Sequence, residues 1–218
     1  MIAAVTLATV TGGCGVGDPT PQLDPRPRYE QIPEDLCDRL PFEDVLAPFG
    51  LILAPAHEPN SDYRAERTYW WNHCAFVALA PNGRLATKLG EFQPSGAVQV
   101  RVYHDVAGAV EAYAQNVYNY VDLRKETLPD ATAAEISGWW GQTGMSLETV
   151  EVLDPDNFTV GDFAASHVDV THLIRHDNLV LMVYGDAIAP AGSKTEVFAL
   201  LHDLIDALID ETAVHLGS

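Results

Sequence analysis

The sequence predicts an α+β domain in which hairpin strands form a sheet and amphipathic helices pack across it. Three observations support this fold class. Segment 97–103 alternates apolar and polar residues, which is typical of a half-buried strand. Asp105 can cap a helix, because apolar residues recur after it at steps of three and four. Ser193 and Glu196 form a capping box ahead of a second amphipathic helix.

The first half of the chain is expected to contain short helices and a hairpin. Helices are predicted at 33–37 and 41–46, the second ending at a proline. Polar segment 60–67 is predicted to be a loop. Period-two character begins at Tyr69, and a strand at 74–79 is expected to turn at Pro81-Asn82-Gly83 and return at 85–89.

The second half is expected to alternate strands with a closing helix. Strands are predicted at 147–153, 167–174 and 179–184, with a turn at 175–178. Segment 179–184 is apolar on both faces, which predicts a central strand that is covered on both sides. The closing helix should pack against the sheet through one apolar stripe: Val197, Leu201, Leu204, Ile205, Leu208 and Ile209.

Composition limits the function classes. The 218 residues fit one domain and a tail, and the formal charge of −19 repels phosphate backbones, so nucleic-acid binding is not expected. The acidic surface serves either solubility or the docking of a basic partner protein.

The N-terminus is interpreted as a lipoprotein leader. Residues 1–13 are first apolar and then small, and they precede Cys14. A leader usually begins with a basic residue, and none precedes Cys14. A start codon assigned too far downstream would explain this difference. Lipidation of Cys14 would anchor the protein to a membrane; the alternative is a plain thiol in a tail. Segment 14–28 is proline-rich and is predicted to be a tether for a single domain at 29–218. The sequence has no apolar run long enough for a spanning helix.

Two other cysteines, Cys37 and Cys74, precede a helical pattern and open a strand pattern. We interpret them as a disulfide that joins the first helix to the sheet and indicates an exported protein. The alternative is two buried thiols.

Several segments resemble uncharacterised actinobacterial secreted lipoproteins related to the extracellular sensor domain of PknH-type kinases. The resemblance covers roughly residues 30–215 and implies an antiparallel sheet with helices against it, a Mog1/PsbP-like fold, a Cys37–Cys74 disulfide and no known catalysis. Its segments are Leu36-Cys37-Asp38-Arg39-Leu40, Cys74-Ala75-Phe76, 98–103, Val160-Gly161-Asp162 and 173–180.

No catalytic motif is found in the sequence, and we predict no catalytic residue, cofactor or metal site. His167, His172 and His176 are the only histidine cluster, but His167 and His172 should point to opposite faces of a strand. We expect these histidines to be exposed polar residues of a hairpin.

Two tryptophan pairs are the candidate binding residues. Trp139 and Trp140 are flanked by glycines and could form an aromatic platform, and Trp70 and Trp71 could line the same cleft. The alternative is that one tryptophan of each pair belongs to the core. The expected function is a non-catalytic binding or sensing module of the cell envelope for a small apolar or cell-wall ligand. An accessory envelope protein and an envelope hydrolase are the alternatives.

Overall fold

The computed structural model describes residues 27–54, 60–79, 94–137, 143–153, 159–160, 163–190 and 192–216. The predicted leader, Cys14, most of the tether, the 81–83 turn, the 85–89 strand, Trp139 and Trp140 lie outside these residues. The described strands are β1 (Ile52–Leu53), β2 (Asn60–Ala65), β3 (Tyr69–Leu79), β4 (Ser95–Tyr103), β5 (Thr132–Ser137), β6 (Thr143–Val152), β7 (Thr159–Val160), β8 (Phe163–His176) and β9 (Leu179–Pro190).

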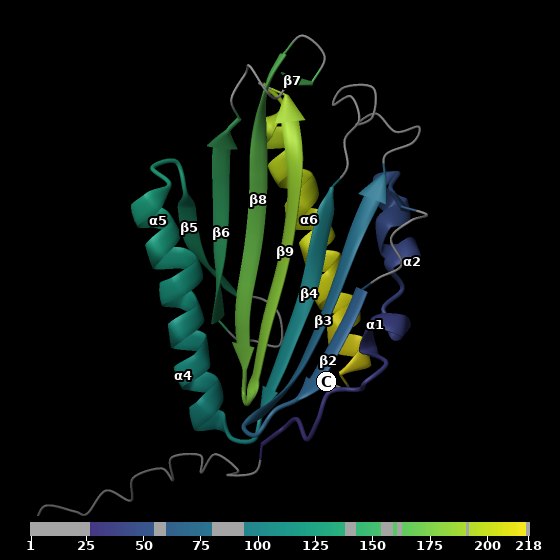
Figure 1. Cartoon of the computed structure of the whole chain (residues 1–218), viewed down its shortest axis with the longest axis vertical. Helices are drawn as coiled ribbons and strands as arrows, with labels where there is room; N and C mark the ends of the chain where they lie inside the picture. Colours follow the sequence, from purple (N-terminus) through teal and green to yellow (C-terminus); the bar gives the residue numbers. More distant parts are fainter. Residues whose placement is uncertain are drawn as a thin grey trace, which may run out of the picture.

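These strands form one antiparallel sheet in the order β1-β3-β4-β9-β8-β6-β5, with β2 beside β3 and β7 beside β8 (Figure 1). The predicted α+β class with an antiparallel sheet is therefore confirmed. β9 lies between β4 and β8, as expected for a strand that is apolar on both faces.

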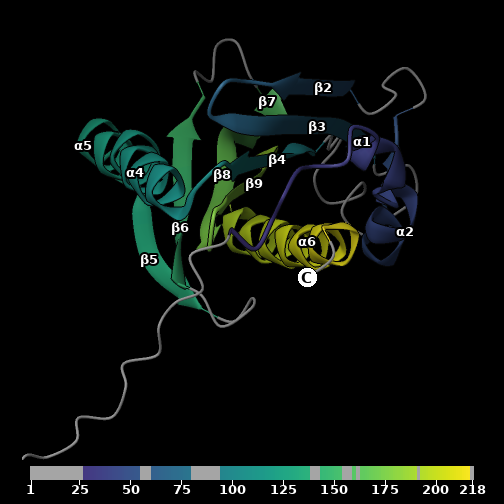
Figure 2. The same ribbon diagram turned by 90° about the horizontal axis from the view of Figure 1, so that it is seen from below.

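Helices lie on both faces of the sheet. α6 crosses one face together with α1 and α2, whereas α4, η2 and α5 lie on the other (Figure 2). None of the described helices is long and apolar enough to cross a membrane. The helices are α1 (Leu36–Arg39), α2 (Phe42–Leu46), a 3₁₀ turn η1 (Ala47–Phe49), α4 (Val106–Val117), a π-helical turn η2 (Tyr118–Asp122), α5 (Leu123–Thr127) and α6 (Lys194–His215).

The main core lies between α6 and the sheet. All six predicted stripe residues of α6 are at most 1% exposed. They meet the even-numbered side chains of β4 and β8 and the odd-numbered side chains of β9, including Val100, Ile174 and Leu181. The predicted capping box is not formed as expected, because the Ser193 hydroxyl makes no cap hydrogen bond. The Ser193 carbonyl accepts the Val197 N–H at 3.0 Å, which is the first backbone hydrogen bond of the helix.

Two segments differ from the sequence prediction. Segment 60–67 is not a loop, because Asn60–Ala65 is the edge strand β2 paired with β3. An edge strand can be polar throughout, since backbone pairing holds it and water covers it, so it has no apolar signal. The sequence of segment 125–143 has no clear helical or strand periodicity, and no element is predicted there. The segment contains β5, which is also an edge strand.

The β8–β9 hairpin joins the start of the domain to the sheet. Asp177, at φ 55°, forms the predicted turn with Asn178, which is fully buried. The Asn178 amide donates to the Tyr29 carbonyl at 2.8 Å and to the Tyr103 carbonyl, and its oxygen accepts the Tyr29 N–H at 3.0 Å. Asn178 therefore fastens the chain at Tyr29 to the β8–β9 hairpin and to the end of β4.

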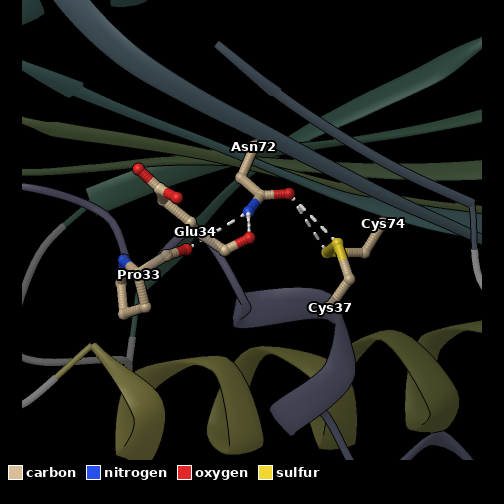
Figure 3. The surroundings of a disulfide bond; sticks show 5 residues. All are labelled: Pro33, Glu34, Cys37, Asn72 and Cys74. Atoms are coloured by element: carbon tan, nitrogen blue, oxygen red, sulfur yellow. Dashed lines mark hydrogen bonds between the residues drawn. A yellow bond between two sulfur atoms is a disulfide. The ribbon is translucent and has the colours of Figure 1, made fainter. Parts of the chain in front are cut away.

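The predicted Cys37–Cys74 disulfide is present and ties α1 to β3, with 5.2 Å between the two Cα atoms. Both cysteines are buried in the α6-side core. Figure 3 shows Asn72 beside the bridge, where its amide donates to the Pro33 carbonyl at 3.3 Å. Its amide oxygen lies 3.0 Å from Cys37 Sγ. Asn72 thus holds the chain that leads into α1 against the strand that carries Cys74.

Candidate functional site

The face of the sheet opposite α6 is only partly covered. Ala109, Tyr113 and Val117 of α4 pack on Leu173, Val180 and Met182, which forms a second, smaller core. Beyond this contact the face carries polar and aromatic side chains from β3, β4, β8 and β9. This face, which we call the α4 face, contains a polar cleft.

The cleft has a volume of about 370 Å³ and lies between the sheet and the helical segment that follows α4. Its floor comes from four adjacent strands, and Tyr120 and Arg124 form its wall. Strand alternation places the floor residues on one face, because their neighbours in sequence point into the α6-side core. The floor residues are His73, Gln99, Asp169, Thr171, Met182 and Tyr184.

The position of the cleft wall depends on a π-helical turn within the helical segment. Residues 118–122 form a π-helical turn between α4 and α5. An extra residue in one turn rotates the side chains that follow, and such turns are frequent at functional sites. The turn follows the α4 residues that pack on the sheet. It contains Tyr120 and leads into α5, which carries Arg124, so both side chains line the cleft.

Asp169 is the most buried charge of the cleft. Its carboxylate accepts from Arg124 Nη1 at 3.1 Å and from the Thr171 hydroxyl at 3.3 Å. Burial raises the pKa of Asp169, while the Arg124 charge opposes the rise. The side chain of Arg124 is 41% exposed, so the pair reaches solvent on one side only. The arrangement presents a guanidinium edge to anything that enters the cleft.

Asp186 lies directly opposite Asp169 on β9. It accepts a hydrogen bond from the Ser95 hydroxyl and lies 3.0 Å from His167 Nε2. The hydrogen bond to Asp186 raises the pKa of His167. A serine nucleophile needs a histidine as its immediate hydrogen-bond partner, with the carboxylate beyond it. Here the Asp186 carboxylate lies between Ser95 and His167. The histidine therefore does not contact the serine hydroxyl, as it would have to do to act as its base.

An aromatic stack continues the cleft floor on β3. Trp71 stacks on the His73 ring at 5.9 Å between centroids and 12° between planes, and Arg64 lies 4.8 Å from the centre of the indole. Burial lowers the pKa of His73, with Asp62 opposing the shift. The stack therefore presents a flat face beside a largely neutral imidazole at pH 7.

The structure separates the two tryptophans that the sequence suggested as cleft partners. Trp70 points to the α6 side, packs against the main core and lies 4.4 Å from the His104 ring centroid. Trp71 is on the α4 face. The pair thus follows the alternative interpretation, in which one tryptophan is a core residue and its neighbour is half-covered.

The histidine cluster was expected to be exposed, and this is wrong for two of its members. His172 and His176 are 3% and 5% exposed, because they alternate onto the buried α6 side of β8. His176 Nδ1 lies 2.7 Å from the Tyr29 hydroxyl. His167 lies on the opposite face, as expected. No group of three or more metal-binding side chains occurs among the described residues.

His172 belongs to a hydrogen-bonded chain on the α6 side. Its Nε2 lies 3.1 Å from His202 Nδ1, and His202 Nε2 lies 2.8 Å from Glu148. Asp206 lies 3.5 Å from His172 Nδ1. Burial, and then the neighbouring His202, lower the pKa of His172 to about 4. Only His172 of this chain is buried, and the chain is remote from the cleft because it lies on the other face of the sheet.

Comparison with known proteins adds no family. Neither the protein-family models nor the curated proteins contain a match to this chain. The cleft residues that the sequence did not single out have one recognisable signal in retrospect. Gln99 is a polar residue inside a strand whose other face is apolar, and Asp169 is an acidic residue between Val168 and Val170. Arg124 has no such signal, since its position depends on the π-helical turn.

Proposed function

We propose that this protein is a non-catalytic binding or sensing module of the bacterial cell envelope, and that the cleft on the α4 face is its ligand site. The supporting observation is the cleft itself. Polar side chains from four adjacent strands converge there beside an aromatic stack. Polar groups inside a fold cost stability, so their concentration at one concave place favours a binding role.

The lining favours a polar cell-wall fragment over an apolar ligand. A sugar ring presents C–H groups to an aromatic face and hydroxyls to planar hydrogen-bonding side chains. Trp71 and His73 offer the first kind of surface, and Gln99 and Arg124 offer the second. Among the described residues that line the cleft, Met182 is the single aliphatic side chain.

Location outside the cytoplasm is part of the proposal. The buried Cys37–Cys74 bridge is typical of oxidising compartments. Lipidation of Cys14, a tether at 14–28, kinship with the actinobacterial lipoproteins and a Mog1/PsbP-like arrangement complete the hypothesis. Cys14→Ser should move the protein from the membrane fraction to the soluble fraction. Unchanged retention would remove the lipid anchor from the proposal without affecting the cleft.

The binding role is tested by titrating the protein with the peptidoglycan disaccharide and following tryptophan emission. We expect a saturable change in the wild type and in Trp70→Phe, and a much smaller one in Trp71→Phe. An equal response in both variants would place the ligand elsewhere, and no response in any protein would count against a cell-wall ligand.

A glycoside hydrolase is the second candidate. Asp169 and Asp186 pair across β8 and β9, the pKa of Asp169 is raised, and retaining enzymes place two carboxyl groups about 5 Å apart. Against it, Asp169 is ion-paired to Arg124, and Asp186 is held by Ser95 and His167. Release of reducing ends from cell-wall polysaccharide by the wild type, but not by Asp169→Asn, would favour the hydrolase. The binding proposal expects no release from either.

A further inference from the structure

One cross-strand row on the α4 face is rich in arginine. The register places Arg64 of β2, Trp71 of β3, Arg101 of β4, Val180 of β9 and Arg175 of β8 side by side. Directly opposed residues of an antiparallel sheet project to the same face. The next row contains His73 and Gln99, which line the cleft, so the arginine row borders the cleft floor.

Arg101 differs from the other arginines of this row. Arg64 bonds to Asp62 at 2.7 Å, and Arg175 donates to the Asp177 carbonyl at 3.2 Å. In the described part of the chain no carboxylate pairs with Arg101. Its guanidinium reaches the Gln99 side-chain oxygen at 3.5 Å, and the Tyr69 ring centre lies 6.0 Å away. It also interacts with the Tyr103 hydroxyl.

Two buried donors in this row have no hydrogen-bond acceptor among the residues that the structure describes. They are Arg101 Nε and Trp71 Nε1, which belong to directly opposed residues. A buried donor without a partner is unfavourable, and a buried charged donor more so. One acceptor group that lies over β3 and β4 on the α4 face would satisfy both donors. A carboxylate suits them, because a guanidinium binds its two oxygens in a planar, charge-assisted geometry.

We infer that the ligand of the cleft carries a carboxylate, and that Arg101 and Trp71 bind this group while the cleft holds the rest of the molecule. The inference rests on the proposed function. The net charge of −19 would by itself repel an acidic ligand, so a preference for one requires a local site of this kind. An acidic cell-wall sugar combines the carboxylate with the ring that the aromatic stack favours.

The test uses two sugars that differ in one carboxylate-bearing substituent, N-acetylmuramic acid and N-acetylglucosamine, in calorimetric titrations. We expect the wild type to bind the acid at least about ten-fold more tightly, a difference of about 1.4 kcal/mol. Arg101→Gln should reduce this ratio to near one while the affinity for the neutral sugar is retained. Arg39→Gln on α1 removes the same charge far from the row and should leave the ratio unchanged.

The outcomes separate the two proposals. Equal affinity of the wild type for both sugars would overturn the carboxylate inference and leave the cell-wall binding role standing. Binding of neither sugar would remove both. An acid preference that persists in Arg101→Gln would also overturn the inference. Trp71→Phe provides an independent check, since it keeps an aromatic face and loses the donor, so it should weaken binding of the acid more than binding of the neutral sugar.

Discussion

The two faces of strands β4, β8 and β9 are made of different kinds of side chain, although they alternate along the same backbone. Toward α6 the strands present fully buried Val98, Val100, Leu181 and Val183. Toward α4 they present Gln99, Asp169 and Tyr184, which line the cleft, and Arg101 and Asp186, which lie beside these residues. The first face supplies the free energy of folding. The second contains the buried charge of Asp169 and, among the described residues, two donors without an acceptor, which do not favour folding and on which the proposed ligand site rests.

The largest effect should come from opening a cavity on the α6 side. Leu181→Ala is expected to lower the free energy of unfolding by about 3–4 kcal/mol, because the side chain is fully buried in the main core. The matched change on the other face, Gln99→Ala, should cost less than about 1 kcal/mol. Urea unfolding measures both. Similar losses for the two variants would contradict the division of roles between the faces.

Removal of the disulfide should have the next largest effect. Cys37→Ala with Cys74→Ala opens a loop that spans a sequence separation of 37, which corresponds to about 3–4 kcal/mol in the chain-entropy model. Because the bridge lies on the α6 side, the folded double variant should bind cleft ligands with unchanged affinity. A loss of affinity in protein that unfolds cooperatively would show that the faces are coupled.

Acid should weaken the α6 side through His172. Its pKa is about 4 in the fold and near 6.5 in the unfolded chain, so the unfolded state binds more protons between these values. Its contribution to stability is lost as the pH falls from 6.5 toward 4, by at most about 3 kcal/mol. Lowered pKa values of His73 and His176 act in the same direction, whereas the raised pKa values of His167, Asp169 and Asp206 act in the opposite one.

The contribution of His172 can be isolated by comparing His172→Gln with the wild type in urea at pH 7 and pH 4.5. The difference in unfolding free energy should shrink at the lower pH, since the variant has no imidazole to protonate. Val214→Gln, at an exposed position near the end of α6, changes no titratable group and should give the same difference at both values. A His172→Gln difference that is independent of pH would rule out this acid-sensitive role.

A smaller effect on stability, with a clear effect on binding, is expected for Arg124→Gln. The Arg124 side chain is 41% exposed but that of Asp169 is 11% exposed, and a glutamine amide can still donate to the carboxylate, so we expect a loss of about 1–2 kcal/mol. Ligand affinity should nevertheless fall, because the cleft wall loses its charged donor. A thermal melt and a binding titration on the same sample separate the two effects, and unaltered affinity would exclude Arg124 from the site.

The sequence predicts the α6 side of the fold well. The stripe of α6, the alternation of β4, the apolar β9 and the pairing of Cys37 with Cys74 follow from local periodicity and elimination, and the structure confirms each. The edge strands β2 and β5 are missed because strands held by one neighbour need no apolar pattern.

The cleft is harder to predict, because its residues come from segments far apart in the sequence. Trp71 and Arg101 meet only through strand register, and Asp169 meets Arg124 only after a π-helical turn. The predicted tryptophan pair lies on β3, the strand that also carries His73 of the cleft floor, but Trp70 packs against the main core. Alternation predicts that Trp70 and Trp71 face opposite ways; which of them faces a cleft depends on where α6 packs.

Adjacent Trp70 and Trp71 allow the most direct test of a ligand site on the α4 face. Their indole N–H resonances can be followed in a two-dimensional ¹H–¹⁵N NMR titration with N-acetylmuramic acid, after assignment with Trp70→Phe and Trp71→Phe. We expect the Trp71 resonance to shift saturably and the Trp70 resonance to stay in place. A Trp71 resonance that does not move, or equal shifts of both, would contradict the assignment of the site to the α4 face.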